Sequence, residues 1–501
     1  MCAGKAGTRQ ALTTELHHNR DSMTEILLEN TLTNRKEVFT PLHDREVRMY
    51  TCGPTVYDYA HIGNYRTFIF QDILRRFLES RGFRMMHVMN LTDVDDRIIQ
   101  NAAGKGVSIF DYTAQYIQAF KEDMSALGCE NPEHLVRATD HIGDMVKLIQ
   151  RLEAKGLTYR SDGSIYYRIS KFPSYGKLSK VDLSGIQAGA RVEVDRYEKA
   201  DARDFALWKA PKPGEHFWET EIGPGRPGWH IECSAMAMTY LGDTLDIHTG
   251  GVDLAFPHHE NEIAQSEAAT GHPFVRYWLH AEHLIIDGEK MSKSLGNFYT
   301  LRDLFKKGHK PSTVRYLLAS VPYRRQLNFT GESIQQAASS VERLRNFAAR
   351  LKESKFAAGA NPQMDARSQQ ALADFDAGLA DDLNTAVALA AIFDLVRDAH
   401  TAMDRGEFKQ ANVRPVSEAI EKFDRIFAVV EDTDEAKLRA LGFGSSGGEI
   451  SPQEIESLIA ERQQARKERN FKRSDEIRRE LAERGILLED TRDGAVRWKR
   501  K

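Results

Sequence analysis

Two short polar segments of the chain carry side chains suited to phosphate chemistry. The first contains His61, Gly63 and Asn64, and the second is a Lys-Met-Ser-Lys-Ser loop that contains Lys290 and Lys293. A helix start offers free backbone N–H groups to an anion, and paired lysines between flexible glycines can clamp a polyphosphate. Histidine and asparagine can donate further hydrogen bonds to phosphate oxygens. Each segment taken alone also fits a capping residue or a solvated surface loop.

Four other side chains form a possible metal-binding set. Cys52, Cys233, His258 and Glu262 offer two thiolates, an imidazole and a carboxylate, a donor set that suits zinc. Because Pro257 favours a helix start, His258 and Glu262 are expected to share one helix face. The set has no Cys-x₂-Cys pair, so its spacing alone is equally compatible with two buried cysteines and a helix-capping histidine.

Alternating strands and helices must position these side chains. Val47–Cys52 predicts a strand, the apolar face within residues 62–78 predicts a helix, and Phe83–Leu91 predicts a second, buried strand. A strand, helix and strand in so short a stretch form a βαβ unit with a right-handed crossover. We therefore expect an α/β fold built on a doubly wound, Rossmann-type parallel sheet.

The predicted sheet is interrupted before it is completed. Residues 111–160 have mostly helical patterns, and strand-like or turn-like character follows at Tyr166–Ile169 and Val192–Tyr197. The sheet is expected to resume near Asp243–His248 and to end near His283–Ile286. The chain after this point is predicted to be helical almost to its end.

These patterns divide the chain into seven parts. They are an N-terminal extension (1–22) expected to be disordered, the first half of the sheet domain (23–140), an insertion (141–225), the second half with the lysine loop (226–300), a helical region (301–440), a Gly/Ser linker (441–450) and a small terminal domain (451–501).

The composition excludes several classes of protein. The chain has 501 residues, 41% of them hydrophobic and 28% charged, which suits a soluble multidomain protein. It contains no run of about 18 apolar residues, so no membrane span is expected. Four scattered cysteines argue against a disulfide framework, and the first 22 residues lack the apolar stretch of a secretory signal. A reducing, cytoplasmic location is therefore expected.

The terminal segment 451–501 differs in charge from the rest of the chain. It holds 14 Lys and Arg against 11 Asp and Glu, whereas the whole chain has a net charge of −4. Basic side chains near an aromatic one, here Trp498, suit single-stranded RNA, whose bases stack and whose phosphates need neutralising. The interspersed acidic residues also fit an ordinary solvated helix.

Longer stretches around these residues resemble known proteins. His-Ile-Gly-Asn with Lys-Met-Ser-Lys-Ser is similar to the signature pair of class I aminoacyl-tRNA synthetases, although Asn64 stands where the class usually has histidine. Residues Thr51–Arg66, Gly228–Met236 and Pro257–Ser266 resemble cysteinyl-tRNA synthetases, and the resemblance runs from about residue 26 to the end. It implies that residues 301–440 form a stem-contact region and helical bundle, and that the terminal domain binds the anticodon.

The resemblance also implies roles for individual residues. The implied zinc ligands are Cys52, Cys233, His258 and Glu262. The implied catalytic residues are His61, Asn64, Lys290 and Lys293. The implied ATP-binding residues are His61, Gly63, Asn64, Gly250, Asp253 and Lys293, with Gly251 in the same stretch. The implied amino-acid pocket contains Gly53, Thr92 and Trp229. One zinc per chain, Mg²⁺ with ATP, L-cysteine and the cysteine tRNA are expected as cofactors and partners, and the chain is expected to act as a monomer without a membrane partner.

Two other functions remain open at this point. A related enzyme joins cysteine to an amino-sugar in mycothiol synthesis, but it would be expected to lack the anticodon-binding end, whereas this chain continues for about 110 residues beyond position 390. An inactive RNA-binding relative would not need an intact lysine loop and His61. Charging of unfractionated tRNA with cysteine and ATP distinguishes all three.

Overall fold

A computed structural model describes residues 24–181, 204–292, 295–443, 452–468, 470–483, 485–490 and 496–500. The predicted N-terminal extension, the stretch Val192–Tyr197 and residues 444–450 of the predicted linker lie outside these residues. The chain forms two compact units that divide between Lys437 and Leu438. None of the described helices is long and apolar enough to cross a membrane.

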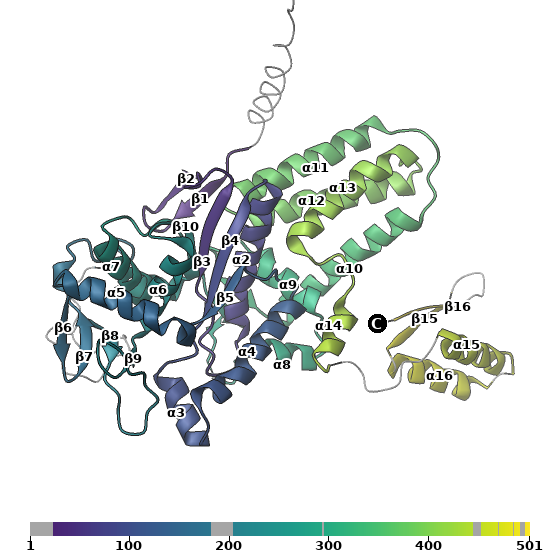
Figure 1. The fold of residues 1–501 in the computed structure, drawn as a ribbon. Helices are drawn as coiled ribbons and strands as arrows, with labels where there is room; N and C mark the ends of the chain where they lie inside the picture. The colour runs from purple at the N-terminus through teal and green to yellow at the C-terminus, as the bar shows by residue number, and fades with distance from the viewer. Residues whose placement is uncertain are drawn as a thin grey trace, which may run out of the picture. The chain divides into compact units, whose positions relative to one another are not determined.

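A five-stranded, wholly parallel sheet forms the centre of the first unit (Figure 1). Its strands, in spatial order, are β11 (Val275–Ala281), β10 (Leu245–Gly251), β3 (Glu46–Thr51), β4 (Arg84–Leu91) and β5 (His134–Arg137). The direction of the chain through the sheet reverses between β3 and β10, and such a switch point opens a crevice at the carboxyl ends of the strands. The predicted doubly wound α/β fold is confirmed.

Helices cover both faces of this sheet. Helix α2 (Ile62–Ser80) is the crossover between β3 and β4, and it buries its apolar side chains against the strands. Helices α5 (Ile142–Ala154), α6 (Trp229–Leu241) and α7 (Glu260–Thr270) gather on the other side (Figure 1). Helix α6 is apolar around most of its circumference, because it packs on β3 and β4 and also against α5 and α7.

Smaller elements surround the sheet. Helices α3 (Asp96–Lys105) and α4 (Ile109–Ala126) lie between β4 and β5 in the chain. An antiparallel sheet contains β6 (Thr158–Ser161), β7 (Ser164–Tyr167), β8 (Phe205–Lys209) and β9 (Arg226–Pro227). A third sheet contains β12 (Leu284–Ile286), β13 (Glu289–Lys290) and β14 (Leu327–Phe329), and β1 (Leu27–Asn30) pairs with β2 (Arg35–Val38).

The structure adds one element to the predictions and corrects another. Residues 111–160 are mostly helical, as predicted, but they also contain the strand β5, whose four residues are too few to show a period. The central sheet does not end at His283–Ile286. Its edge strand is Val275–Ala281, and Leu284–Ile286 instead pairs with β13 and β14.

A helical bundle follows the sheet domain (Figure 1). After α8 (Leu301–Lys306) and α9 (Pro311–Ser320), it contains α10 (Gly331–Glu353), α11 (Pro362–Ala380), α12 (Thr385–Asp404) and α13 (Val413–Phe427), and α14 (Asp434–Ala440) follows. The buried Arg315 of α9 joins the bundle to α2, because it pairs with Asp72 at 2.5 Å and donates to the carbonyl oxygens of Ile426 and Phe427. Removal of one partner from such a pair leaves a buried charge uncompensated.

The second unit is small. It contains α15 (Pro452–Lys467), α16 (Phe471–Glu483) and the hairpin β15 (Ile486–Asp490) and β16 (Val496–Arg500). Its core consists of Ile455, Ile459, Ile477, Leu481 and Ile486. Trp498 packs beside this core and donates a hydrogen bond to Glu456, while Phe471 is exposed.

Candidate active site and metal centre

The structure brings the four predicted metal-binding side chains together. Their ligand atoms all lie within 4.8 Å of one another, and all four side chains are buried. The Cys52 and Cys233 sulfurs are 4.0 Å apart, His258 Nε2 lies 3.4 Å from the Cys233 sulfur, and Glu262 Oε1 lies 3.1 Å from His258 Nε2. Cys52 follows β3, Cys233 lies on α6, and the other two flank the start of α7.

The predicted helix start at Pro257 agrees with the backbone. Phe256 is extended (φ −139°, ψ 132°), the residues after it in the short helical segment Ala255–His259 have helical dihedrals, and α7 continues from Glu260. His258 and Glu262 are therefore four positions apart along helical backbone, and their side chains meet across one turn.

A second, overlapping set also has metal-binding geometry. Its members are Cys52, His248, His259 and Glu262, again with ligand atoms within 4.8 Å. The first set offers two thiolates where the second offers one, and zinc favours sulfur donors in this kind of mixed site. His248 moreover lies 3.0 Å from Glu262 Oε2, where it orients the carboxylate and directs Oε1 into the first set.

A shell of histidines fixes the orientation of the other ligands. His230 Nδ1 lies 2.9 Å from His258 Nδ1, so His258 turns its Nε2 toward Cys233. His259 Nε2 lies 3.4 Å from the Cys52 sulfur, and its Nδ1 lies 2.7 Å from His280. Partners of this kind hold ligand side chains in the tautomer and rotamer that metal binding requires.

The electrostatics of the cluster favour ionised ligands. The hydrogen bond with Cys52 lowers the pKa of Cys233 to about 6, and that of Cys52 is raised by its burial and by Cys233. Burial alone would lower the pKa of His258 and raise that of Glu262. The Cys233 thiolate outweighs burial at His258, whose pKa rises to about 10, and the charges of His248 and His258 lower the pKa of Glu262 to about 2. The pair of thiols therefore has one pKa below and one pKa above that of a free thiol.

The predicted amino-acid pocket lies beside this cluster. Gly53 follows Cys52, and its N–H donates to Asn90 Oδ1 at 2.9 Å. Thr92 lies directly after β4, where its backbone bridges to the loop after Gly53. Trp229 opens α6 with 39% of its surface exposed, and its ring lies 4.3 Å from that of His258.

Glu232 is a residue beside the predicted pocket residues that the sequence analysis did not identify. Its carboxylate is buried and accepts a hydrogen bond of 3.1 Å from the Thr92 hydroxyl. Burial and the neighbouring Cys233 raise the pKa of Glu232 well above its usual value, although the Thr92 hydrogen bond opposes this. A glutamate within a helix normally indicates a solvated face. The one available signal was that Glu232 and Cys233 lie three and four residues after Trp229, a spacing that brings side chains of a helix close to one another.

The two phosphate motifs meet in the structure. His61 caps α2: its ring accepts a hydrogen bond from the Asn64 N–H, and Asn64 Oδ1 accepts one from the His61 N–H. The His61 backbone bridges to Thr300, and a side chain at Gly63 would contact the Met291 terminal methyl group at 3.1 Å. The lysine loop therefore packs on the first turn of α2. Within it, Lys290 ends β13, whereas Lys293 lies outside the described residues.

The capping geometry accounts for the asparagine in the first motif. Asn64 Oδ1 is committed to the His61 N–H, so its side-chain amide is the group that can donate to an anion. Gly250 and Gly251 end β10 at the same edge of the sheet, and Asp253 follows in a short turn. A side chain at Gly250 would lie 2.7 Å from the His259 ring, so glycine is required for the packing there.

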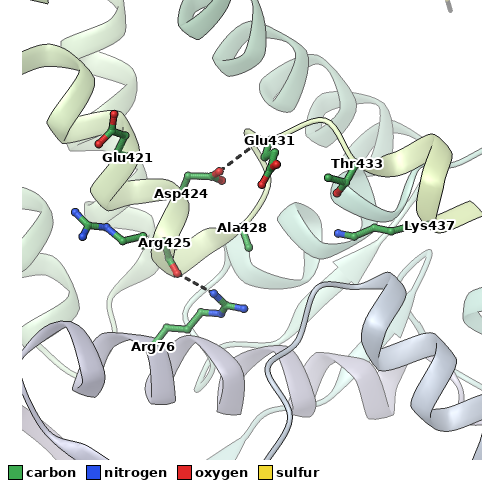
Figure 2. A pocket seen from close by; sticks show the side chains of 8 residues that line it. All are labelled: Arg76, Glu421, Asp424, Arg425, Ala428, Glu431, Thr433 and Lys437. Carbon is green, nitrogen blue, oxygen red and sulfur yellow. Dashed lines mark hydrogen bonds between the residues drawn. The ribbon is translucent and has the colours of Figure 1, made fainter. Parts of the chain in front are cut away.

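A separate open pocket lies at the joint between α2 and the bundle (Figure 2). The charged side chains that line it are Arg76, Arg425, Lys437, Glu421, Asp424 and Glu431. Arg76 donates to the Arg425 carbonyl oxygen, and Asp424 accepts the Glu431 N–H (Figure 2). Arg76 lies about 20 Å along α2 from its first turn. The balanced, internally bonded charges indicate a structural joint rather than part of the site above.

Comparisons with known proteins identify the family of the chain. The model of the class I (C) tRNA synthetase catalytic domain matches residues 38–339, the DALR domain model matches 374–431, and the model of the cysteinyl-tRNA ligase anticodon-binding domain matches 451–498. The cysteine–tRNA ligase of Koribacter versatilis (strain Ellin345) is 56% identical over 490 residues, which cover 94% of this chain and 99% of that protein. The chain belongs to the cysteinyl-tRNA synthetase family.

Two further comparisons concern a second cysteine–tRNA ligase and a solved structure that is similar in fold. The cysteine–tRNA ligase of Solibacter usitatus (strain Ellin6076) is 57% identical over 472 residues, with 94% of this chain and 99% of that protein covered. Mycobacterium tuberculosis methionyl-tRNA synthetase, solved with methionyl-adenylate, has a TM-score of 0.59 at 17% identity over 79% of this chain and 94% of that chain. At this identity the likeness concerns the fold alone, which is that of a class I synthetase.

Proposed function

We propose that this enzyme activates cysteine with ATP and transfers it to the 3′ end of the cysteine tRNA, with a bound zinc ion selecting the substrate thiol. The single observation that carries the proposal is the buried cluster of Cys52, Cys233, His258 and Glu262, which lies next to Gly53, Thr92 and Trp229. The cluster fits zinc in donor type and in the hydrogen bonds behind each ligand. When bound there, zinc supplies a soft Lewis acid that a thiolate can coordinate and a hydroxyl serves poorly.

Residues of the other motifs bind the phosphates and stabilise their charge. A cysteine carboxylate oxygen attacks the α-phosphorus of ATP, the bond to the β-phosphate oxygen breaks, and pyrophosphate leaves. His61, the Asn64 amide, Lys290 and Lys293 stabilise the charge on the phosphates, with Gly63 allowing close approach. Gly250 and Asp253 bind the adenosine, and Mg²⁺ accompanies ATP. Positioning and electrostatics account for most of the rate.

The second step uses the RNA-binding parts of the chain. A ribose hydroxyl of the terminal adenosine attacks the cysteinyl carbonyl carbon, and AMP leaves with the electron pair of the broken acyl–phosphate bond. We assign residues 301–440 to stem contact and the helical bundle, and residues 451–501 to anticodon binding. The insertion over 141–225 belongs to the catalytic domain, and the monomer is the functional unit.

Two measurements on one preparation test the proposal. Cysteine-dependent ATP–pyrophosphate exchange reports adenylate formation, and labelled cysteine on unfractionated tRNA reports transfer. Exchange without charging, together with ligation of cysteine to an amino-sugar, would favour the mycothiol-type reaction, and absence of exchange would reject the proposal.

The role of zinc has its own test by X-ray absorption at the zinc edge. Metal content should be about one zinc per chain, and cysteine should add one Zn–S bond of about 2.3 Å that serine does not add. Cys233→Ser should lower both the zinc content and the affinity for cysteine. A sulfur count that stays fixed when cysteine binds would make the zinc purely structural.

A further inference from the structure

Asn297 holds the lysine loop through its side chain. The Ser292 N–H donates to Asn297 Oδ1 at 2.8 Å, and Asn297 Nδ2 donates to the Lys290 carbonyl oxygen at 3.3 Å. Both partners are backbone groups, so the two bonds fix the path of the chain and the Lys290 side chain takes no part in them. One amide thus uses its acceptor and a donor to hold residues that lie five and seven positions earlier.

The loop needs a contact of this kind because its flanks are permissive. Gly288 and Gly296 have φ values of +83° and +68°, in the left-handed region that favours glycine. A segment between two such residues can adopt many backbone conformations, whereas a lysine stabilises a phosphate only from a defined position. The two bonds from Asn297 restrict the segment that carries Lys290 to one of these conformations.

Residues 297–300, here named the strap, fasten the lysine loop to the start of α2. The Phe298 ring meets the His61 ring edge to face, with centroids 5.3 Å apart and planes at 80°. The Tyr299 carbonyl oxygen accepts the Ile62 N–H at 3.0 Å. The strap therefore connects the two phosphate motifs through both a ring contact and a backbone hydrogen bond.

Helix α8 fixes the far end of the strap. Thr300 is its N-cap: the Thr300 hydroxyl accepts the Asp303 N–H at 3.2 Å, and Asp303 Oδ2 accepts the Thr300 N–H at 3.0 Å. Such a reciprocal capping box fixes the direction in which the chain enters a helix. The Thr300 backbone also bridges to His61. The strap is thus anchored at the helix on one side and holds the lysine loop through Asn297 on the other.

We propose that Asn297 is a positioning residue for adenylate formation, because it holds the lysine loop beside the first turn of α2 while the strap keeps the loop and His61 at a fixed separation. The inference rests on the proposed function, which assigns His61, Lys290 and Lys293 to the phosphates of ATP. Asn297 acts on those phosphates through the two lysines. Since both motifs must contact the same phosphates in the transition state, a fixed separation reduces the entropy lost in reaching it.

Asn297→Ala removes both hydrogen bonds to the loop. The kcat of cysteine-dependent ATP–pyrophosphate exchange should fall by about 10- to 100-fold because the loop loses its position, and the KM for cysteine should change by less than about 2-fold. Lys293→Ala should hide this loss. In the double variant, Asn297→Ala should lower kcat by less than about 3-fold further, since a residue that acts through the loop has little left to position.

Limited digestion of the full-length enzyme with trypsin gives a readout that does not depend on activity. The rate of cleavage after Lys290, followed by mass spectrometry of the fragment that ends there, should rise by at least about 5-fold in Asn297→Ala, because the loop opens more often. Asn297→Asp keeps an acceptor for the Ser292 N–H but offers no donor to the Lys290 carbonyl oxygen. It should be cleaved at a rate between those of wild type and Asn297→Ala.

Asn328→Ala is the matched control. Asn328 lies on β14, and its Oδ1 accepts the Gly288 N–H at 3.0 Å, at the turn between β12 and β13. It holds the same hairpin by the same kind of bond, but at the end away from Ser292, so exchange and cleavage after Lys290 should keep their wild-type rates. Multiplicative losses in the double variant, or an unchanged rate of cleavage after Lys290 in Asn297→Ala, would overturn the inference. Absence of exchange in the wild-type enzyme would instead reject the proposed function, while the cleavage rates would still test the contact.

Discussion

Gly53 offers the sharpest test of how the fold builds the site. A Cβ atom at this position would lie 1.8 Å from the carbonyl oxygen of Asn90, 3.0 Å from its carbonyl carbon and 3.1 Å from the Met89 side chain. The first contact is with backbone in the middle of the sheet, which cannot rotate away as a side chain would. To reach even the 3.0 Å limit, the segment after β3 must move by at least about 1.2 Å from β4.

A displacement of this size is large for the groups that Gly53 adjoins. Cys52 is the preceding residue, and metal–ligand distances tolerate only about ±0.2 Å. The Gly53 N–H would also lose its bond to Asn90. We therefore expect Gly53→Ala to lower zinc content below half of the wild-type value and to reduce cysteine-dependent ATP–pyrophosphate exchange by about 100-fold, the effect typical of a 1 Å misplacement in an active site.

Gly104→Ala is the matched control for this change. Gly104 lies in helix α3 with a helical backbone and nothing within 4 Å of the Cβ position. Alanine should stabilise this helix slightly, by about 0.4–1 kcal/mol, and leave zinc content and exchange unchanged. Wild-type zinc content and exchange in Gly53→Ala would refute the argument that this backbone contact holds the site together.

Three further predictions address other parts of the chain. Lys293→Ala should abolish most adenylate formation in the exchange assay without a change in thermal midpoint, and near-normal exchange would exclude Lys293 from catalysis. Deletion of residues 441–501 should spare exchange but damage tRNA charging, because residues 438–501 form a compact unit with a core of their own; equal loss of both activities would assign them to the fold. Burial lowers the pKa of His87 to about 3, so an unfolded chain binds a proton below pH 6.5 that the folded chain does not. The free energy of unfolding should therefore fall by up to about 1.4 kcal/mol per pH unit between pH 6.5 and pH 5. The His87→Asn variant should show a smaller slope of urea midpoint against pH than the wild type. An identical slope in the two proteins would contradict the role of His87.

Long periodic segments were predictable from the sequence. The strand, helix and strand that became β3, α2 and β4 each gave a strong hydrophobic pattern, because each buries one face or both in the central sheet. The strand β5 has four residues and is too short to show a period. The edge strand β11 was missed because a neighbouring apolar segment, Leu284–Ile286, competed for the same assignment.

Some residues of the site were also predictable from the sequence, and others were not. The metal-binding set was inferred by resemblance, since Cys52 and Cys233 are 181 residues apart and only the sheet brings them to 4.0 Å. Helical spacing from His258 indicated Glu262, and in the structure the nearby Glu260 instead accepts the N–H groups of Gly176, Leu178 and Ser179. Nothing in the sequence distinguishes Glu232 from a solvated glutamate, because its burial and its bond to Thr92 depend on how α6 packs against β4.

The zinc proposal also accounts for the dependence of the site on the central sheet. The two cysteine ligands come from distant segments, Cys52 after β3 and Cys233 on α6, and their sulfurs lie 4.0 Å apart. Hydrogen bonds hold both segments to the end of β4, one from the Gly53 N–H to Asn90 and one from the Thr92 hydroxyl to Glu232. The fold therefore places the two sulfurs before a metal binds, and the hydrogen bonds behind the other ligands fix their orientation in the same way. A hydroxyl in place of the substrate thiol then fails because it is a poor zinc ligand and because the placed side chains cannot rearrange to compensate for it.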